Sequence, residues 1–139
     1  MTARRLYVDT SAYLCVLLGE RGHDALVDEM RGAELLSSAL LVLEVRRNLT
    51  RHARNGALTA SQLQDAVERL RTDVESFQLR DLTLDLCDQP TVPAVSTPRS
   101  LDLAHLTTAL WFHAQIPITR FVTLDADQSL AARELSLPI

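Results

Sequence analysis

Lysine is absent from this sequence: all fourteen basic residues are arginine. Every mechanism that depends on a lysine amine is therefore excluded. Eighteen acidic residues outnumber the arginines and give a formal net charge of −4. Because a dedicated nucleic-acid-binding domain is usually basic, the net charge alone argues against that class of protein.

Cysteine is scarce and long apolar runs are missing. Cys15 and Cys87 show no metal-ligand spacing, and each lies in an apolar run, which predicts two reduced core thiols in a cytosolic protein. No segment reaches the roughly 18 apolar residues of a membrane span. Asp9 interrupts the first apolar run, so we expect no signal peptide. The 139 residues fit one domain, and we expect residues 1–139 to form a single cytoplasmic domain.

The rest of the pattern alternates between short strands and helices. Strands are expected at residues 6–8, 34–37, 74–79 and 121–124, with an edge strand at 137–139. Helices are expected at 11–18, 24–30, 39–55, 59–72, 81–87, 101–114 and 126–135. The helix that starts at Thr59 carries a capping box with Gln62, and residues 88–98 form a proline-rich loop. This alternation predicts an α/β fold with a mostly parallel sheet covered on both faces.

Four acidic residues occupy positions that suggest a common site. In parallel sheets, sites form beyond the carboxyl ends of the strands, and Asp9 and Asp125 both follow predicted strands. Glu44 and Asp102 lie in nearly apolar stretches of predicted helices, where an unpaired charge would be costly to bury.

Each acid also has an ordinary structural explanation. Asp9 and Asp125 can cap the helices that follow them. Glu44 can pair with Arg47 or Arg51, one or two turns further along its helix, and Asp102 can favour its helix dipole. One shared cause explains the four together more simply than four separate causes.

A hard divalent cation is that shared cause. Carboxylates brought close together repel one another, and Mg²⁺, or alternatively Mn²⁺, relieves the repulsion and prefers oxygen ligands. Such a site favours in-line attack of an activated water on a phosphodiester. The pattern leaves open whether one or two metal ions act.

Neighbouring residues add support to this site. Ser11 and Thr123 can donate hydrogen bonds to a ligand carboxylate or a bound water, and His105 lies one turn after Asp102 in a supporting or packing position. Arg47 and Arg51 share a helical stripe with Glu44, and guanidinium groups suit contacts to RNA phosphates. A solvated helix face is the alternative for these arginines.

Five segments occur in a fixed order along the chain: 7–12 (YVDTSA), 43–47 (LEVRR), 99–109 (RSLDLAHLTTA), 121–125 (FVTLD) and 131–139 (AARELSLPI). With them the chain resembles the PIN-domain family, and within it the VapC toxins of bacterial toxin–antitoxin systems. The resemblance implies a flavodoxin-like α/β/α sandwich and a magnesium-dependent endoribonuclease. It also implies a VapB-type antitoxin that covers the site, and a homodimer within a larger toxin–antitoxin complex.

The resemblance also ranks the candidate ligands. Asp9 and Asp102 match the best metal ligands and Glu44 comes next. Asp125 matches a position that varies more and can act through water, and Asp127 can substitute for it. The loop at 88–98 is longer and richer in proline than the family pattern. This departure concerns the shape of the loop and leaves the acids in place.

Three other classes of protein compete with this interpretation. A receiver-type phosphoacceptor domain needs a lysine, which is absent here. A haloacid-dehalogenase-type phosphatase needs an aspartate two residues after the first, where this chain has Ser11. A degenerate PIN module that only binds RNA or protein is the closest rival, and the presence of all four acids argues against it.

Overall fold

Four parallel strands form the central sheet of the computed structural model, which describes residues 3–89, 95–96 and 99–139. The strands are β1 (Arg5–Val8), β2 (Glu34–Ser38), β3 (Phe77–Arg80) and β4 (Arg120–Val122). Their spatial order is β3-β2-β1-β4, and every pairing is parallel. β1 is therefore a central strand: Tyr7 pairs with Leu36 on one side and Phe121 on the other. The residue that follows β1 lies in the middle of the carboxyl edge of the sheet.

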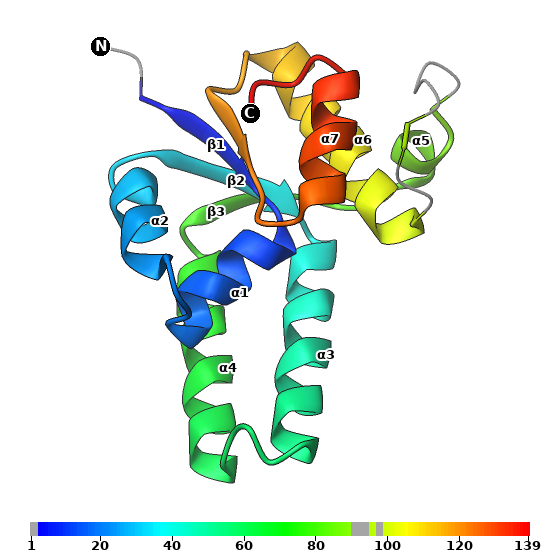
Figure 1. Cartoon of the computed structure of the whole chain (residues 1–139). Helices are drawn as coiled ribbons and strands as arrows, with labels where there is room; N and C mark the ends of the chain where they lie inside the picture. Colours follow the sequence, from blue (N-terminus) through cyan, green and yellow to red (C-terminus); the bar gives the residue numbers. More distant parts are fainter. Residues whose placement is uncertain (1–2, 90–94, 97–98) are drawn as a thin grey trace.

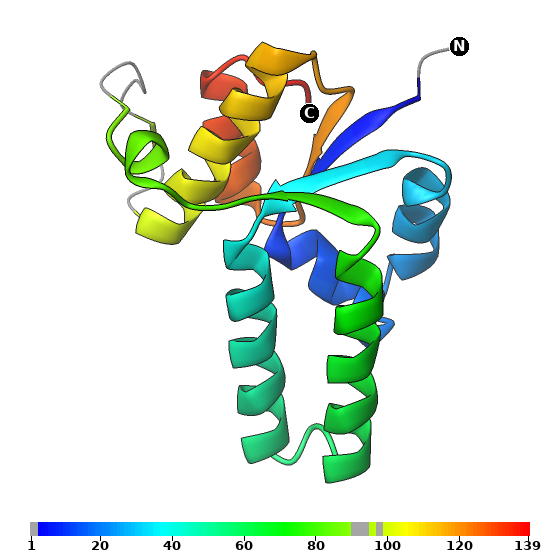
Figure 2. The same ribbon diagram turned by 180° about the vertical axis from the view of Figure 1, so that it is seen from behind.

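Helices cover both faces of the sheet, as predicted (Figures 1 and 2). They are α1 (Thr10–Leu18), α2 (His23–Met30), α3 (Leu40–Arg54), α4 (Ala60–Val74), α5 (Leu84–Cys87), α6 (Ser100–Gln115) and α7 (Ala126–Glu134). The first four pack on one face, while α6 and α7 pack on the other. Alternate residues of β1 serve the two cores, because Leu6 and Val8 face α1–α4 and Tyr7 faces α6 and α7. The predicted α/β sandwich is confirmed.

The hairpin of α3 and α4 projects away from the sheet (Figure 2). The predicted capping box is present at the start of α4: Thr59 Oγ1 accepts from Gln62 N at 3.1 Å, and Thr59 N donates to Gln62 Oε1 at 2.9 Å. Leu41, Val45 and Leu49 are fully buried on one face of α3. The opposite face of that helix is left to charged side chains.

Several predicted boundaries were wrong. β4 ends at Val122, where its partner β1 ends at Val8, and not at Leu124 as predicted, so Asp125 does not follow the strand directly. Residues 74–76 belong to the end of α4 and the turn after it, so β3 starts later than predicted. The expected edge strand at 137–139 does not form, although Pro138 O accepts from Phe121 N at 2.7 Å. Pro138 has no N–H with which to continue a ladder.

The two cysteines differ in environment. Cys15 is buried in α1, as predicted, but Cys87 is exposed, so the prediction of two core thiols was wrong for Cys87. α5 is a single turn in which Leu86 is the one buried residue, so Cys87 at its end faces outward. The predicted loop at 88–98 lies mostly outside the described residues. No helix of the described part of the chain is long and apolar enough to span a membrane.

Candidate active site

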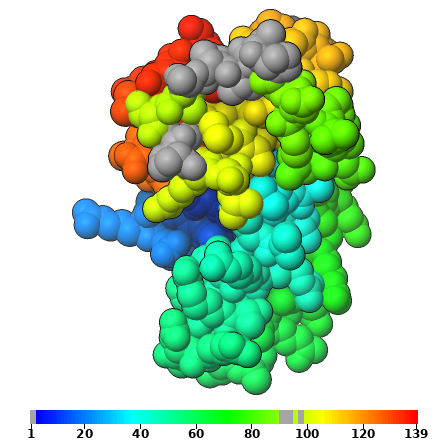
Figure 3. Space-filling model, turned by 90° about the vertical axis from the view of Figure 1, so that its right-hand side faces the viewer, coloured from blue at the N-terminus to red at the C-terminus, as the bar shows by residue number. Residues whose placement is uncertain are grey.

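Asp9 lies at the carboxyl edge of the sheet, directly after the central strand β1. It is the N-cap of α1, with extended backbone, and its Oδ1 accepts from Ala12 N at 3.1 Å. Figure 3 views this side of the molecule, where the dark-blue segment around β1 and α1 is recessed between the start of α6 and the outer part of α3. The capping explanation is therefore correct for Asp9, and it leaves the rest of the carboxylate available for other contacts.

Two hydroxyl groups hold the Asp9 carboxylate. Ser11 Oγ donates to Oδ1 at 2.7 Å, and Thr123 Oγ1 donates to Oδ2 at 2.5 Å. Each hydroxyl in turn accepts a backbone N–H: Leu124 N donates to Ser11 at 3.0 Å, and Asp125 N donates to Thr123 at 3.1 Å. Because these amides fix the hydroxyl oxygens as acceptors, the hydroxyl protons are directed at Asp9. The segment after β4 thus orients the acid that follows β1.

Asp9 is only 5% exposed. Burial raises the pKa of Asp9 above its usual value, and the hydrogen bonds from Thr123 and Ser11 oppose this rise. No arginine in the described residues forms a salt bridge with Asp9. A buried carboxylate that is well supplied with hydroxyl donors but has no guanidinium partner is suited to receive a cation.

Glu44, in the second turn of α3, is joined to α6 and α1. Its Oε1 lies 2.7 Å from His105 Nε2 and accepts from Thr10 Oγ1 at 2.8 Å. His105 is 3% exposed, and its Nδ1 lies 2.8 Å from the hydroxyl of Tyr7. Glu44 therefore pairs with His105. The ordinary explanation considered for Glu44, a pair with an arginine of α3, does not apply among the residues that the structure describes. A supporting position was expected for His105, but no pattern in the sequence pointed to Tyr7.

Asp125 caps α7. Its Oδ1 accepts from Asp127 N at 2.9 Å and from Gln128 N at 3.1 Å. The side chain of Asp127 is exposed, one residue into the helix. Asp125 thus caps a helix, which was the structural explanation considered for it from the sequence. Its second oxygen has no protein hydrogen bond within the described part of the chain.

Asp102 lies in the first turn of α6 and is half-buried. Its backbone carbonyl accepts from Gln128 Nε2 of α7 at 3.0 Å. Gln128 is 1% exposed and also binds Asp125 through its backbone N–H, so it links the turn that bears Asp102 to the cap of α7. Sequence reasoning missed Gln128, because a glutamine in a short helix looks like a surface residue.

The described residues do not assemble the four predicted acids into one metal-holding group, so a cation at this site would have few protein ligands. In residues 3–89, 95–96 and 99–139, no three His, Cys, Asp or Glu side chains are grouped so that they could hold a metal ion. Mg²⁺ commonly keeps several waters and binds one or two carboxylates together with substrate phosphates. Asp9 provides a buried carboxylate of that kind, and the hydrogen bonds of Glu44 and Asp125 to the described residues each use one carboxylate oxygen, Oε1 and Oδ1.

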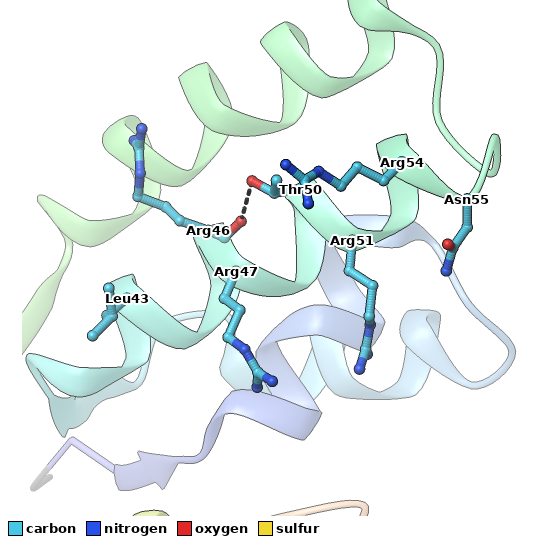
Figure 4. Close-up of a pocket in the computed structure, with 7 residues that line it drawn as sticks. All are labelled: Leu43, Arg46, Arg47, Thr50, Arg51, Arg54 and Asn55. Carbon is cyan, nitrogen blue, oxygen red and sulfur yellow. Dashed lines mark hydrogen bonds between the residues drawn. The ribbon is translucent and has the colours of Figure 1, made fainter.

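Arg47 and Arg51 lie on the exposed face of α3, one and two turns beyond Glu44. Both border a surface hollow of about 470 Å³, shown in Figure 4. Arg51 donates to Asn48 Oδ1 at 2.7 Å, and neither arginine forms a salt bridge within the described residues.

The fold and the site define an α/β domain with acidic residues beyond the carboxyl edge of an all-parallel sheet. The family model of the PIN domain matches residues 6–134, and the chain belongs to this family. PIN domains are typically metal-dependent nucleases, so this is a nuclease fold. No curated protein matches the chain.

Proposed function

We propose that this protein is a magnesium-dependent endoribonuclease. The observation that carries the proposal is the state of Asp9: a buried carboxylate with a raised pKa, oriented by two hydroxyls and lacking a cationic partner within the described residues. Holding such a group ionised costs free energy in the absence of a cation. A site that keeps this arrangement is suited to bind one.

Asp9 and Asp102 are the proposed principal ligands, Glu44 is the next, and Asp125 contributes directly or through water. Because no three acids of the described residues are grouped to hold a metal ion, waters complete the proposed coordination. When bound, Mg²⁺, or alternatively Mn²⁺, supplies charge shielding for a phosphodiester and lowers the pKa of a bound water. The protein contributes orientation: Ser11 and Thr123 fix Asp9, and His105 holds Glu44. Arg47 and Arg51 contact the phosphates of the RNA.

We propose further that the protein is the toxin of a VapBC-type toxin–antitoxin system and acts in the cytoplasm. The five ordered segments shared with VapC toxins support this subtype. It predicts that a VapB-type antitoxin covers the site and that the protein forms a homodimer within a larger complex. Expression without the antitoxin gene should arrest growth, and co-expression with the adjacent small gene should restore it. Unimpaired growth without the antitoxin would contradict the toxin role but not the nuclease activity.

The test of the activity uses Asp9→Asn. Asparagine caps helices as well as aspartate does, so this substitution removes the charge while keeping the α1 cap, which alanine would not. Purified wild type should cleave RNA with Mg²⁺ and stop with EDTA, and Asp9→Asn should be inactive with an unchanged circular dichroism spectrum. The matched control is Asp65→Asn on the exposed side of α4, which should cleave normally.

Equal cleavage by wild type and Asp9→Asn would refute the metal-site assignment. If wild type binds RNA but cleaves with neither Mg²⁺ nor Mn²⁺, the degenerate RNA-binding module is the correct alternative.

A further inference from the structure

The outer face of α3 carries a basic groove, defined as the hollow lined by Arg46, Arg47, Arg51 and Arg54 together with Leu43 and Thr50. In Figure 4, Arg47 and Arg51 extend together to one side of α3, while Arg46 and Arg54 lie along its other side. Thr50 lies between them, with its hydroxyl donating to Arg46 O at 2.9 Å. The groove therefore has guanidinium groups along both borders.

These four arginines are not needed to neutralise the protein's own acids. All four are exposed, and none forms a salt bridge with a carboxylate in the described part of the chain. Four of the fourteen arginines of a chain with net charge −4 are thus gathered on one helix face. Such a group repels itself unless an anion lies against it, which makes the groove an electrostatic site for a polyanion.

The groove begins beside the candidate active site. Glu44 precedes Arg47 by nearly one turn, and Leu43, at the same end, has a 67% exposed side chain. From Arg46 to Arg54 the helix rises by about 12 Å, at about 1.5 Å per residue. A stacked nucleic-acid strand carries one phosphate per about 3.4 Å, so this length spans about four phosphates.

We propose that the basic groove binds the phosphate backbone of an RNA strand on one side of the bond that is cut, and that it reads no base sequence. This inference rests on the proposed function for the position of the cut. The groove contains no aromatic side chain among its lining residues on which a base could stack. Leu43 offers an apolar surface to the nucleotide nearest the site, and the arginines engage the phosphates beyond it.

A repeating polyanion fits the groove better than an acidic protein segment. Arg47, Arg51 and Arg54 recur at about one helical turn, so they form a continuous line of positive charge that the unbroken phosphate backbone of a strand can follow. An acidic peptide would present carboxylates at irregular positions and is the alternative that the experiment must separate.

Binding is measured without metal, so that it is independent of cleavage. Asp9→Asn protein in EDTA is titrated into a fluorescent 12-nucleotide RNA of mixed sequence at several salt concentrations. Four phosphate contacts predict a slope of log K against log salt of about −2.8, at about −0.7 per contact with a single strand. Adding Arg51→Ala should make the slope less negative by about 0.7. Adding Arg47→Ala and Arg54→Ala as well should make it less negative by about 2 in total.

The matched control is Arg133→Ala in α7, an exposed arginine on the other side of the sheet that forms no salt bridge within the described residues. It should leave the slope unchanged. An equal change in the control and in Arg51→Ala, or no change in either, would overturn the proposal. Displacement of the RNA by polyglutamate at equal charge concentration would also overturn it, in favour of an acidic protein partner.

Active protein is used to test whether the basic groove binds RNA on only one side of the bond that is cut. RNAs that are shortened stepwise from one end or the other should show a rise in KM, with kcat little changed, for only one of the two ends. The arginine variants should abolish that dependence on length. A symmetric dependence would overturn the placement. If wild type cleaves nothing, the proposed nuclease function fails, while the binding result still decides whether the groove holds RNA.

Discussion

His105 and Glu44 are joined across the two helical layers, with 2.7 Å between Nε2 and Oε1. Burial raises the pKa of Tyr7 well above its ordinary value, so its hydroxyl keeps a proton that it can donate to His105 Nδ1. In that tautomer, Nε2 carries the proton and donates it to Glu44. The orientation of Glu44 is thus set by a buried chain of three side chains that begins in β1.

Replacing His105 should impair the site more than it impairs the fold. We expect His105→Ala to reduce cleavage by about 10- to 100-fold and to raise the Mg²⁺ concentration needed for half-maximal rate, because Glu44 loses its donor. His105→Gln retains a donor amide and should recover part of the loss. The measurement is the rate of RNA cleavage against Mg²⁺ concentration for the three proteins. Identical Mg²⁺ curves for all three would show that His105 is only a packing residue.

Asp9→Asn should make the metal-free protein more stable. Since the pKa of Asp9 is raised in the folded state, the folded protein binds its proton more tightly than the unfolded chain does. The stabilising contribution of this group is therefore complete below pH 3.8, the ordinary pKa of an aspartate. It is lost as the pH rises through the raised pKa of the folded state. Thermal unfolding at neutral pH in EDTA should give a higher Tm for the variant, and cleavage should fall by at least about 100-fold.

Magnesium supplies the control for this prediction. It should raise the Tm of wild type, because the ion binds the folded state, and leave Asp9→Asn unchanged. A lower Tm for the variant in EDTA would show that the ionised carboxylate stabilises the fold without a cation.

Replacing Gln128 should lower both the free energy of unfolding and the rate of RNA cleavage. Gln128→Ala removes a buried hydrogen bond to Asp102 O and leaves a void, so we expect a loss of about 2–4 kcal/mol in the free energy of unfolding. Gln128→Met keeps most of the volume and should cost less than about 2 kcal/mol. Both variants should lower cleavage by about 10-fold at fixed Mg²⁺, because the turn that bears Asp102 is no longer tied to α7. Urea denaturation and cleavage rates separate the two effects; full activity in Gln128→Met would rule out the positioning role.

The two thiols should react at different rates. Burial raises the pKa of the Cys15 thiol and shields it, whereas Cys87 is exposed. Iodoacetamide at neutral pH should therefore label one thiol in the native protein, and mass spectrometry of peptides should identify it as Cys87. Both should react in 6 M guanidinium. Rapid native labelling of Cys15 would mean that α1 opens locally.

Local patterns predicted most of the fold. The run that ends at Asp9 predicted a strand that delivers an acid to the sheet edge, and Thr59 with Gln62 predicted the start of α4; both are present. The end of β4 could not be predicted, because it depends on where β1 stops pairing. The exposure of Cys87 depends on α5 being one turn long, a length that its apolar sequence does not indicate.

The contacts within the site are mostly beyond sequence reasoning, since they join residues far apart in the chain. Thr123 was expected to donate to a ligand carboxylate, but the sequence does not indicate that this carboxylate is Asp9, 114 positions away. Tyr7 and His105 are 98 positions apart and meet only because α6 packs over the centre of the sheet. No pattern in the sequence around either residue predicts this hydrogen bond. The local caps formed by Asp9 and Asp125 could be predicted from adjacent residues, but partners from distant segments could not.

The pairing of the first strand with the last has a consequence for biosynthesis. Asp9 and its donor Thr123 are 114 positions apart, and β4 can dock beside β1 only after the intervening chain has been made. A nascent polypeptide that has not yet released β4 from the ribosome lacks Thr123, Asp125 and Gln128 at the sheet edge, whatever else has folded. Because such non-local pairing forms late, the complete site appears only after β4 has been made and has docked beside β1. A nascent or truncated chain that lacks β4 therefore carries Asp9 without the hydroxyl that orients it.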